Sequence, residues 1–99
     1  MKIKKEVTVK TFKDLEFKTH PNVGPGGTQA VMEFKNGYGV SVITGEMFYT
    51  DEKHPYEMAI RVKGKLCYTT PITDDVLGYL TANDVTGYMK KAQELPKED

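Results

Sequence analysis

Three aspartates in one short stretch of the chain have the types and spacing that could do chemistry. In PITDDVLGYLTANDVTGYM, Asp74 and Asp75 are adjacent, and Asp84 follows within the same stretch. Neighbouring carboxylates can bind a metal ion or exchange protons with a substrate. They can also stabilise the first turn of a helix, because its free N–H groups and its dipole favour a negative charge there.

The spacing of these acids favours helix caps. Thr73 precedes Asp74 and Asp75, and Thr81 stands three positions before Asp84, as in a capping box. The stretch is not an EF-hand loop, since its glycine is misplaced and the terminal glutamate is missing. We therefore predict that these five residues are structural caps, and that the chain has no catalytic residue, no metal site and no cofactor.

Other reactive residue types are isolated from one another. The segment GPGGT lacks the ending of a phosphate-binding loop and precedes a strand. His20 and His54 each precede a proline, without the spacing of a zinc site. Cys67 is the only cysteine, so no disulfide can form within the chain and a reducing compartment is expected. We predict a structural, at least half-buried Cys67, and an enzyme acting through Cys67 or the acids is the third of three functional readings.

Composition indicates one soluble domain. The chain has 99 residues, of which 38% are hydrophobic and 28% charged, as in folded globular proteins. The net charge is zero, so no overall field would attract nucleic acid or an anionic membrane. No run of residues resembles a signal peptide or a membrane-spanning helix. We expect a cytoplasmic protein with neither nucleic acid nor a membrane as partner.

Alternation with period two dominates the chain before Pro71 and predicts strands. It is clearest in YEMAIRV, and it recurs in IKKEVTV, LEFKTH, AVMEF, YGVSV and KLCYTT. Asn36-Gly37 predicts a hairpin with a type I′ turn, and Lys63-Gly64 predicts a second hairpin. The segments PNVGPGGT and TDEKHP are predicted loops.

After Pro71 the apolar residues recur at helical spacing. We predict a short helix over about residues 74–80 and a longer one over about residues 82–95, ended by Pro96. The predicted fold is α+β: an antiparallel sheet of five or six strands within residues 2–70, packed by C-terminal helices in a single domain, residues 1–99.

The aromatic pair Phe48-Tyr49 lies where a strand gives way to a polar loop. Because consecutive strand residues point to opposite faces, we expect one of the two to be exposed, as in a contact surface, although both could pack beside the core. His54 and Arg61 complete the candidate binding residues.

Four segments carry a resemblance to known proteins: KTFKDLEFKTHP, FKNGYGVSVI, YTDEKHPYEMAI and YTTPITDDVLGYLTANDVTGYMKKAQEL. In this order they resemble a group of small uncharacterised proteins of phages and prophages, with NGYGVSV and TPITDDVLGYLT the most specific. The resemblance implies a viral accessory protein that binds a host protein, and by analogy an anti-defence inhibitor of the anti-CRISPR kind. It transfers no binding or catalytic residue.

Two further arrangements remain open. In the alternative function, tyrosines, lysines and Arg61 hold a small ligand or a nucleotide signal, and the protein acts as a sponge. An unpaired edge strand would also allow two copies to associate as a homo-oligomer. The N-terminal strand, with Lys2, Lys4 and Lys5, is the expected edge.

Overall fold

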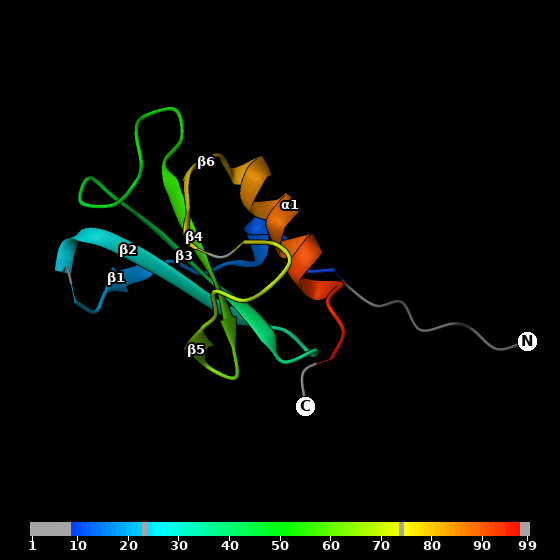
Figure 1. Cartoon of the computed structure of the whole chain (residues 1–99). Helices are drawn as coiled ribbons and strands as arrows, with labels where there is room; N and C mark the ends of the chain where they lie inside the picture. The colour runs from blue at the N-terminus through cyan, green and yellow to red at the C-terminus, as the bar shows by residue number, and fades with distance from the viewer. Residues whose placement is uncertain (1–8, 23, 74, 98–99) are drawn as a thin grey trace, which may run out of the picture.

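The computed structural model describes residues 9–22, 24–73 and 75–97. It contains one antiparallel sheet with an α-helix packed on one face (Figure 1), which confirms the predicted α+β class. Lys2, Lys4 and Lys5 of the predicted edge strand lie outside the described residues, as does Asp74. No helix in the described part of the chain is long and apolar enough to cross a membrane.

In the described part of the chain, six strands make up the sheet, and the first four lie side by side in the order β1-β2-β3-β4. Both β5 and β6 pair with the edge of β4 that β3 leaves free. A 3-10 turn precedes the sheet and one α-helix follows it. The bounds are η1 (Phe12–Asp14), β1 (Lys18–His20), β2 (Gly24–Glu33), β3 (Tyr38–Gly45), β4 (Tyr56–Val62), β5 (Lys65–Leu66), β6 (Leu77–Leu80) and α1 (Ala82–Gln93).

The core lies between α1 and the central strands. Across the β3–β4 pair, Val40 is opposite Ile60 and Val42 is opposite Met58, and all four are almost fully buried. Burying one side chain of this size contributes about 1.5–3 kcal/mol. The other side of the core comes from the apolar stripe of α1, whose buried residues are Val85, Met89 and Ala92. Both the predicted long helix and its predicted buried face are therefore confirmed.

The short helix predicted over residues 74–80 is wrong, because Leu77–Leu80 form β6 and pair with β4. A helix of about two turns is only marginally stable, whereas the free edge of β4 offers backbone partners. Thr73 and Asp75 cap a turn before β6 and not a helix. The Thr73 hydroxyl accepts a hydrogen bond from Asp75 N (3.1 Å), and Asp75 Oδ1 accepts one from Val76 N (2.7 Å).

Strand boundaries also differ from the prediction. PNVGPGGT is not wholly a loop, because β2 begins at Gly24 and pairs with the far end of β3. The β1–β2 register shifts between Thr19 and His20, and this irregularity accommodates the glycine-rich start of β2. LEFKTH is a strand only from Lys18 onward, and KLCYTT only over Lys65–Leu66.

The hairpin at Asn36-Gly37 is confirmed, but its turn is not of type I′. Only Gly37 has a positive φ, 90°, whereas a type I′ turn requires two such residues. Gly37 N donates to Phe34 O (3.2 Å), and Phe34 N donates to Tyr38 O (2.7 Å). The connection is therefore a longer loop that ends in a left-handed glycine. The hairpin at Lys63-Gly64 is confirmed, with positive φ at both residues.

This loop places Asn36 against the end of α1. Its Nδ2 donates to Ala92 O (2.8 Å) and to Leu95 O (3.1 Å), while its Oδ1 accepts from Tyr38 N (3.1 Å). The last carbonyl groups of a helix have no partner within the helix. The side chain of Asn36 therefore joins the β2–β3 hairpin to the C-terminus of α1.

The N-terminal segment lies along the same helix. The Gln93 carboxamide accepts a hydrogen bond from Lys10 N and donates one to Lys10 O, both at 2.9 Å. Two residues further along the segment, Phe12 N donates to Thr86 Oγ1 (3.0 Å). Neutral hydrogen bonds therefore hold this part of the chain on α1.

We expect Asn36→Ala to lower the free energy of unfolding by about 2 kcal/mol, since each lost hydrogen bond is worth about 0.5–1.5 kcal/mol. Urea denaturation followed by circular dichroism measures this change. The matched control is Lys35→Ala, an exposed change in the same loop, which should cost less than about 0.5 kcal/mol. Equal stability of the two variants would contradict the role of Asn36 as a cap.

Candidate functional site

A bulge in β6 turns a tyrosine toward solvent. Between its two pairs with β4, β6 has Gly78 and Tyr79 where β4 has only Glu57. Tyr79 has φ of 57°, a left-handed conformation that costs a non-glycine residue about 1–2 kcal/mol. The residue is 54% exposed. Bulges of this kind often redirect a side chain beside a functional site.

Tyr49, from the loop between β3 and β4, lies beside Tyr79 and is 60% exposed. The two ring centroids are 6.4 Å apart, and we call these residues the tyrosine pair. Tyr79 N donates to Tyr49 O (2.8 Å), and Tyr49 N donates to Glu57 Oε1 (2.9 Å). A Cβ atom at Gly78 would lie 2.7 Å from the Cβ of Tyr49, so the approach of the two segments requires a glycine. The backbone therefore holds both rings at the surface.

The two aromatic residues at 48 and 49 point in different directions. Phe48 is half-buried and packs on the His20 ring, with 5.4 Å between centroids, whereas Tyr49 is exposed. Met47, in the same loop, is 76% exposed. The sequence predicts that one residue of Phe48-Tyr49 is exposed, and that residue is Tyr49.

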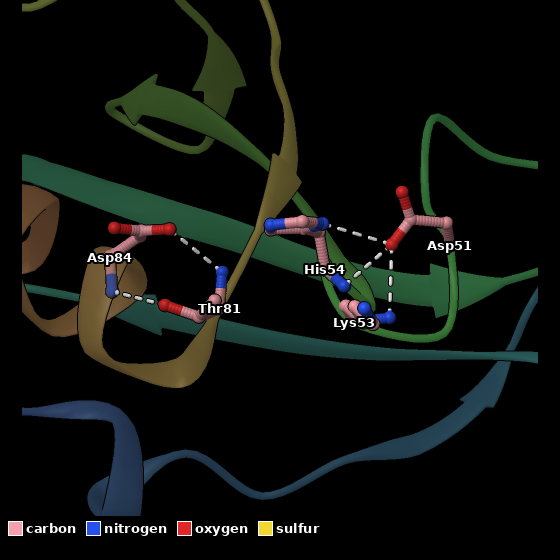
Figure 2. A network of polar contacts seen from close by, with 5 residues as sticks. All are labelled: Asp51, Lys53, His54, Thr81 and Asp84. Carbon is pink, nitrogen blue, oxygen red and sulfur yellow. Dashed lines mark hydrogen bonds and ion pairs between the residues drawn. The ribbon is translucent and has the colours of Figure 1, made fainter.

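The loop that carries Tyr49 is closed by Asp51 and His54. Asp51 Oδ1 accepts hydrogen bonds from Lys53 N (3.0 Å) and His54 N (2.7 Å), and it lies 3.0 Å from His54 Nδ1. Figure 2 shows the imidazole between Asp51 and the start of α1, with its other edge toward Asp84. His54 thus helps to close the loop, and its hydrogen bonds with Asp51 are those of a structural residue.

The predicted capping box at the start of α1 is confirmed. Thr81 N donates to Asp84 Oδ2 (2.9 Å), and Asp84 N donates to Thr81 Oγ1 (3.1 Å). The pKa of Asp84 lies below its ordinary value of 3.8. The largest cause is the hydrogen bond from the N–H of Thr81, followed by the interaction with the Thr81 hydroxyl and by the charge of His54. The N–H of His54, then its imidazole, lower the pKa of Asp51 in the same way.

Arg61 lies on the opposite face of the sheet from the core and forms an ion pair there. Its Nε is 2.9 Å from Glu33 Oε2, and its Nη2 donates to Gly64 O (2.9 Å). The register places Gly39 between Arg61 and Glu33, in the middle of three adjacent strands. A Cβ atom at Gly39 would lie 2.9 Å from Glu33 Oε1, so the absence of a side chain leaves space for the ion pair.

The same face contains a small hollow of about 260 Å³. Arg61, Gln29 and the buried Ser41 are among its lining residues, and Gln29 Nε2 donates to Ser41 Oγ (3.0 Å). Neither Tyr49 nor Tyr79 lines this hollow, so the structure does not bring the candidate residues Arg61 and Tyr49 into one site. Glu57 lies between the two features, since it lines the hollow and accepts a hydrogen bond from Tyr49 N.

Cys67 is half-buried, with its Sγ 3.5 Å from Thr69 Oγ1. Within the described ranges, no three histidine, cysteine, aspartate or glutamate side chains gather as a metal ion would require.

The sequence does not single out Tyr79, because the spacing of apolar residues around LGYL favours a helix. Its signal in the sequence is weak: a glycine precedes an aromatic residue between two leucines. A glycine inside a strand can mark a bulge or a close approach of two backbones, and here it marks both.

We expect Tyr79→Gly to be more stable than Tyr79→Ala by about 1 kcal/mol, since glycine adopts positive φ without a steric cost. Urea denaturation compares the two variants. Val31, exposed on β2, is the matched control. At this position, Val31→Ala should be more stable than Val31→Gly by about 0.5–1 kcal/mol. Finding Tyr79→Ala at least as stable as Tyr79→Gly would contradict the strained conformation.

Acid should destabilise the protein through Asp51 and Asp84. A carboxyl group whose pKa is lower in the folded state stabilises the fold above its unfolded pKa, and this stabilisation is lost as the pH falls through the folded pKa. Asp51→Asn/Asp84→Asn keeps the acceptor oxygens and removes both charges. Its unfolding temperature should therefore fall less than that of the wild type between about pH 5 and pH 2. Parallel curves for the two proteins would refute this contribution.

The chain matches no protein-family model, no curated protein and no solved structure.

Proposed function

We propose that this protein is a non-enzymatic binding protein that contacts another protein through the tyrosine pair, Tyr49 and Tyr79. With the resemblance to small phage proteins, the proposed role is a viral accessory protein that binds a host factor in the bacterial cytoplasm. The more specific proposal is an anti-defence inhibitor that acts by occupying its target.

The observation that carries this proposal is the exposure of two adjacent tyrosines, of which Tyr79 has a strained backbone conformation. Tyrosine is enriched among the few interface residues that supply most of the binding energy. Such a residue binds best when its position is already set, because less conformational entropy is then lost on association. The hydrogen bond from Tyr79 N to Tyr49 O and the close approach of Gly78 provide this order before any partner arrives.

A strained residue also has a cost that the fold must offset. Left-handed tyrosine costs about 1–2 kcal/mol, and glycine at the same position would avoid that cost. Strain of this kind is concentrated at functional positions in proteins. An exposed tyrosine in this conformation contributes little to the core, so a role at the surface accounts for its presence.

A second candidate function is the small-ligand sponge, and the hollow lined by Arg61 favours it. Its volume of about 260 Å³ is below the roughly 300–1,000 Å³ of most ligand pockets. The guanidinium of Arg61 is already paired with Glu33. A nucleotide would have to compete with that ion pair, so the tyrosine pair is the better supported site.

The test is affinity capture from lysates of phage-sensitive bacteria, followed by binding measurements with the purified captured protein. Tyr49→Ala/Tyr79→Gly should weaken binding at least tenfold, about the loss of one strong interface contact. The matched control is Tyr68→Ala, which removes a tyrosine that is 42% exposed elsewhere. Unchanged affinity in the double variant would contradict the proposal. A rise in unfolding temperature with cyclic nucleotides, abolished by Arg61→Ala, would favour the sponge.

A further inference from the structure

The loop that carries Tyr49 is acidic. Its residues, 46–55, contain three carboxylates and one lysine, in a chain whose net charge is zero. In Figure 1 this loop projects beyond the sheet on the side where β6 leads into α1. The carboxylates are those of Glu46, Asp51 and Glu52.

Several of these carboxylates converge on one open hollow. Glu46, Asp51 and Glu52 line a space of about 420 Å³ together with Thr50 and other residues of the loop. Within the described part of the chain, no hydrogen bond or ion pair engages the side chains of Glu46 and Glu52, both of which are exposed. These two charges are therefore available to a partner, whereas Asp51 is held by His54.

The loop that lines the hollow also carries Tyr49, while Tyr79 lies beside Tyr49 on β6. Tyr49 stands in the sequence between Glu46 and Asp51, and its neighbour Thr50, which lines the hollow, donates from Oγ1 to Gly45 O (2.7 Å). Glu57, at the start of β4, adds a further carboxylate, whose Oε1 accepts a hydrogen bond from Tyr49 N. An approaching chain would thus meet aromatic rings and negative charge together.

A cationic side chain can interact with both the carboxylates and the tyrosine rings. A guanidinium or ammonium group pairs with carboxylates, and it is also attracted to the face of a tyrosine ring. Arginine suits such a surface best, because its planar group can stack on a ring while it donates hydrogen bonds to an acid. Acidic or uncharged partner segments would leave the carboxylates without compensation.

We propose that the partner presents an arginine- or lysine-rich protein segment, with its aliphatic and cationic groups against the tyrosine pair and one cationic side chain in the hollow beside Glu46 and Glu52. This inference depends on the proposed function, since it names the chemistry of the partner at the same surface. Charge complementarity is the reason for choosing a basic protein segment over other occupants.

The first experiment uses a defined probe, a fluorescein-labelled peptide of alternating glycine and arginine. Fluorescence anisotropy should detect its binding at about 50 mM salt and weaker binding at about 300 mM. A matched peptide of alternating glycine and glutamate should not bind. Amide chemical-shift changes in nitrogen-edited spectra should centre on residues 46–52 and Tyr79. Shifts spread over the whole surface, or none, would overturn the proposal.

Charge reversal provides the matched comparison. Glu46→Lys/Glu52→Lys should weaken binding of the arginine peptide at least about tenfold. Glu16→Lys/Glu94→Lys makes the same change in net charge at two exposed acids away from the loop, and binding should change less than about twofold. Equal losses in both variants would mean only a non-specific charge effect and would overturn the proposed site.

Binding of the captured protein separates this inference from the proposed function. If Tyr49→Ala/Tyr79→Gly abolishes that binding while Glu46→Lys/Glu52→Lys retains it, the tyrosine surface stands and the cationic partner is wrong. If both variants bind as the wild type does, both proposals fail. Loss of binding in both variants, with Glu16→Lys/Glu94→Lys unaffected, supports both.

Discussion

The outer edge of β4 is the constraint on which the rest of the structure depends. Its backbone groups need partners, and two short strands share that edge: β5 pairs near Val62, and β6 pairs near Tyr56. Because the chain must return to this edge after β5, β6 ends directly before Thr81, the residue that caps α1. The pairing therefore determines where the helix begins over the core. It also brings the β3–β4 loop beside β6, which creates the tyrosine pair.

Much of this architecture follows from short-range patterns in the sequence. The alternation in YEMAIRV predicts the face that Met58 and Ile60 bury, and the apolar stripe of the last helix predicts its contact with the sheet. The capping box at Thr81 and Asp84 was also recognisable, because its hydrogen bonds form between residues three positions apart. These features can be predicted from the sequence because each of them depends on one local interaction.

The remaining features depend on contacts between distant residues. Val76, Leu77 and Leu80 have a spacing that fits a helix as well as a bulged strand, and only the vacancy beside β4 decides between them. The orientation of Tyr79 depends in turn on that bulge. In the sequence Asn36 resembles a residue of a tight hairpin turn, yet its side chain donates hydrogen bonds to carbonyl groups at the end of α1, far along the chain. Sequence periodicity carries no information about such partners.

The line of Arg61, Gly39 and Glu33 across three strands has a consequence for how this chain can diverge. A Cβ atom at position 39 would lie 2.5 Å from Met32 O and 2.9 Å from Glu33 Oε1, so the backbone of β2 requires a glycine there as well as the ion pair does. Loss of Arg61 or Glu33 would therefore leave the need for Gly39 in place, whereas a side chain at position 39 would disturb both the β2–β3 pairing and the ion pair. In a set of divergent relatives, this glycine should persist even where the two charges are replaced, and it would help to identify the fold where overall identity has faded.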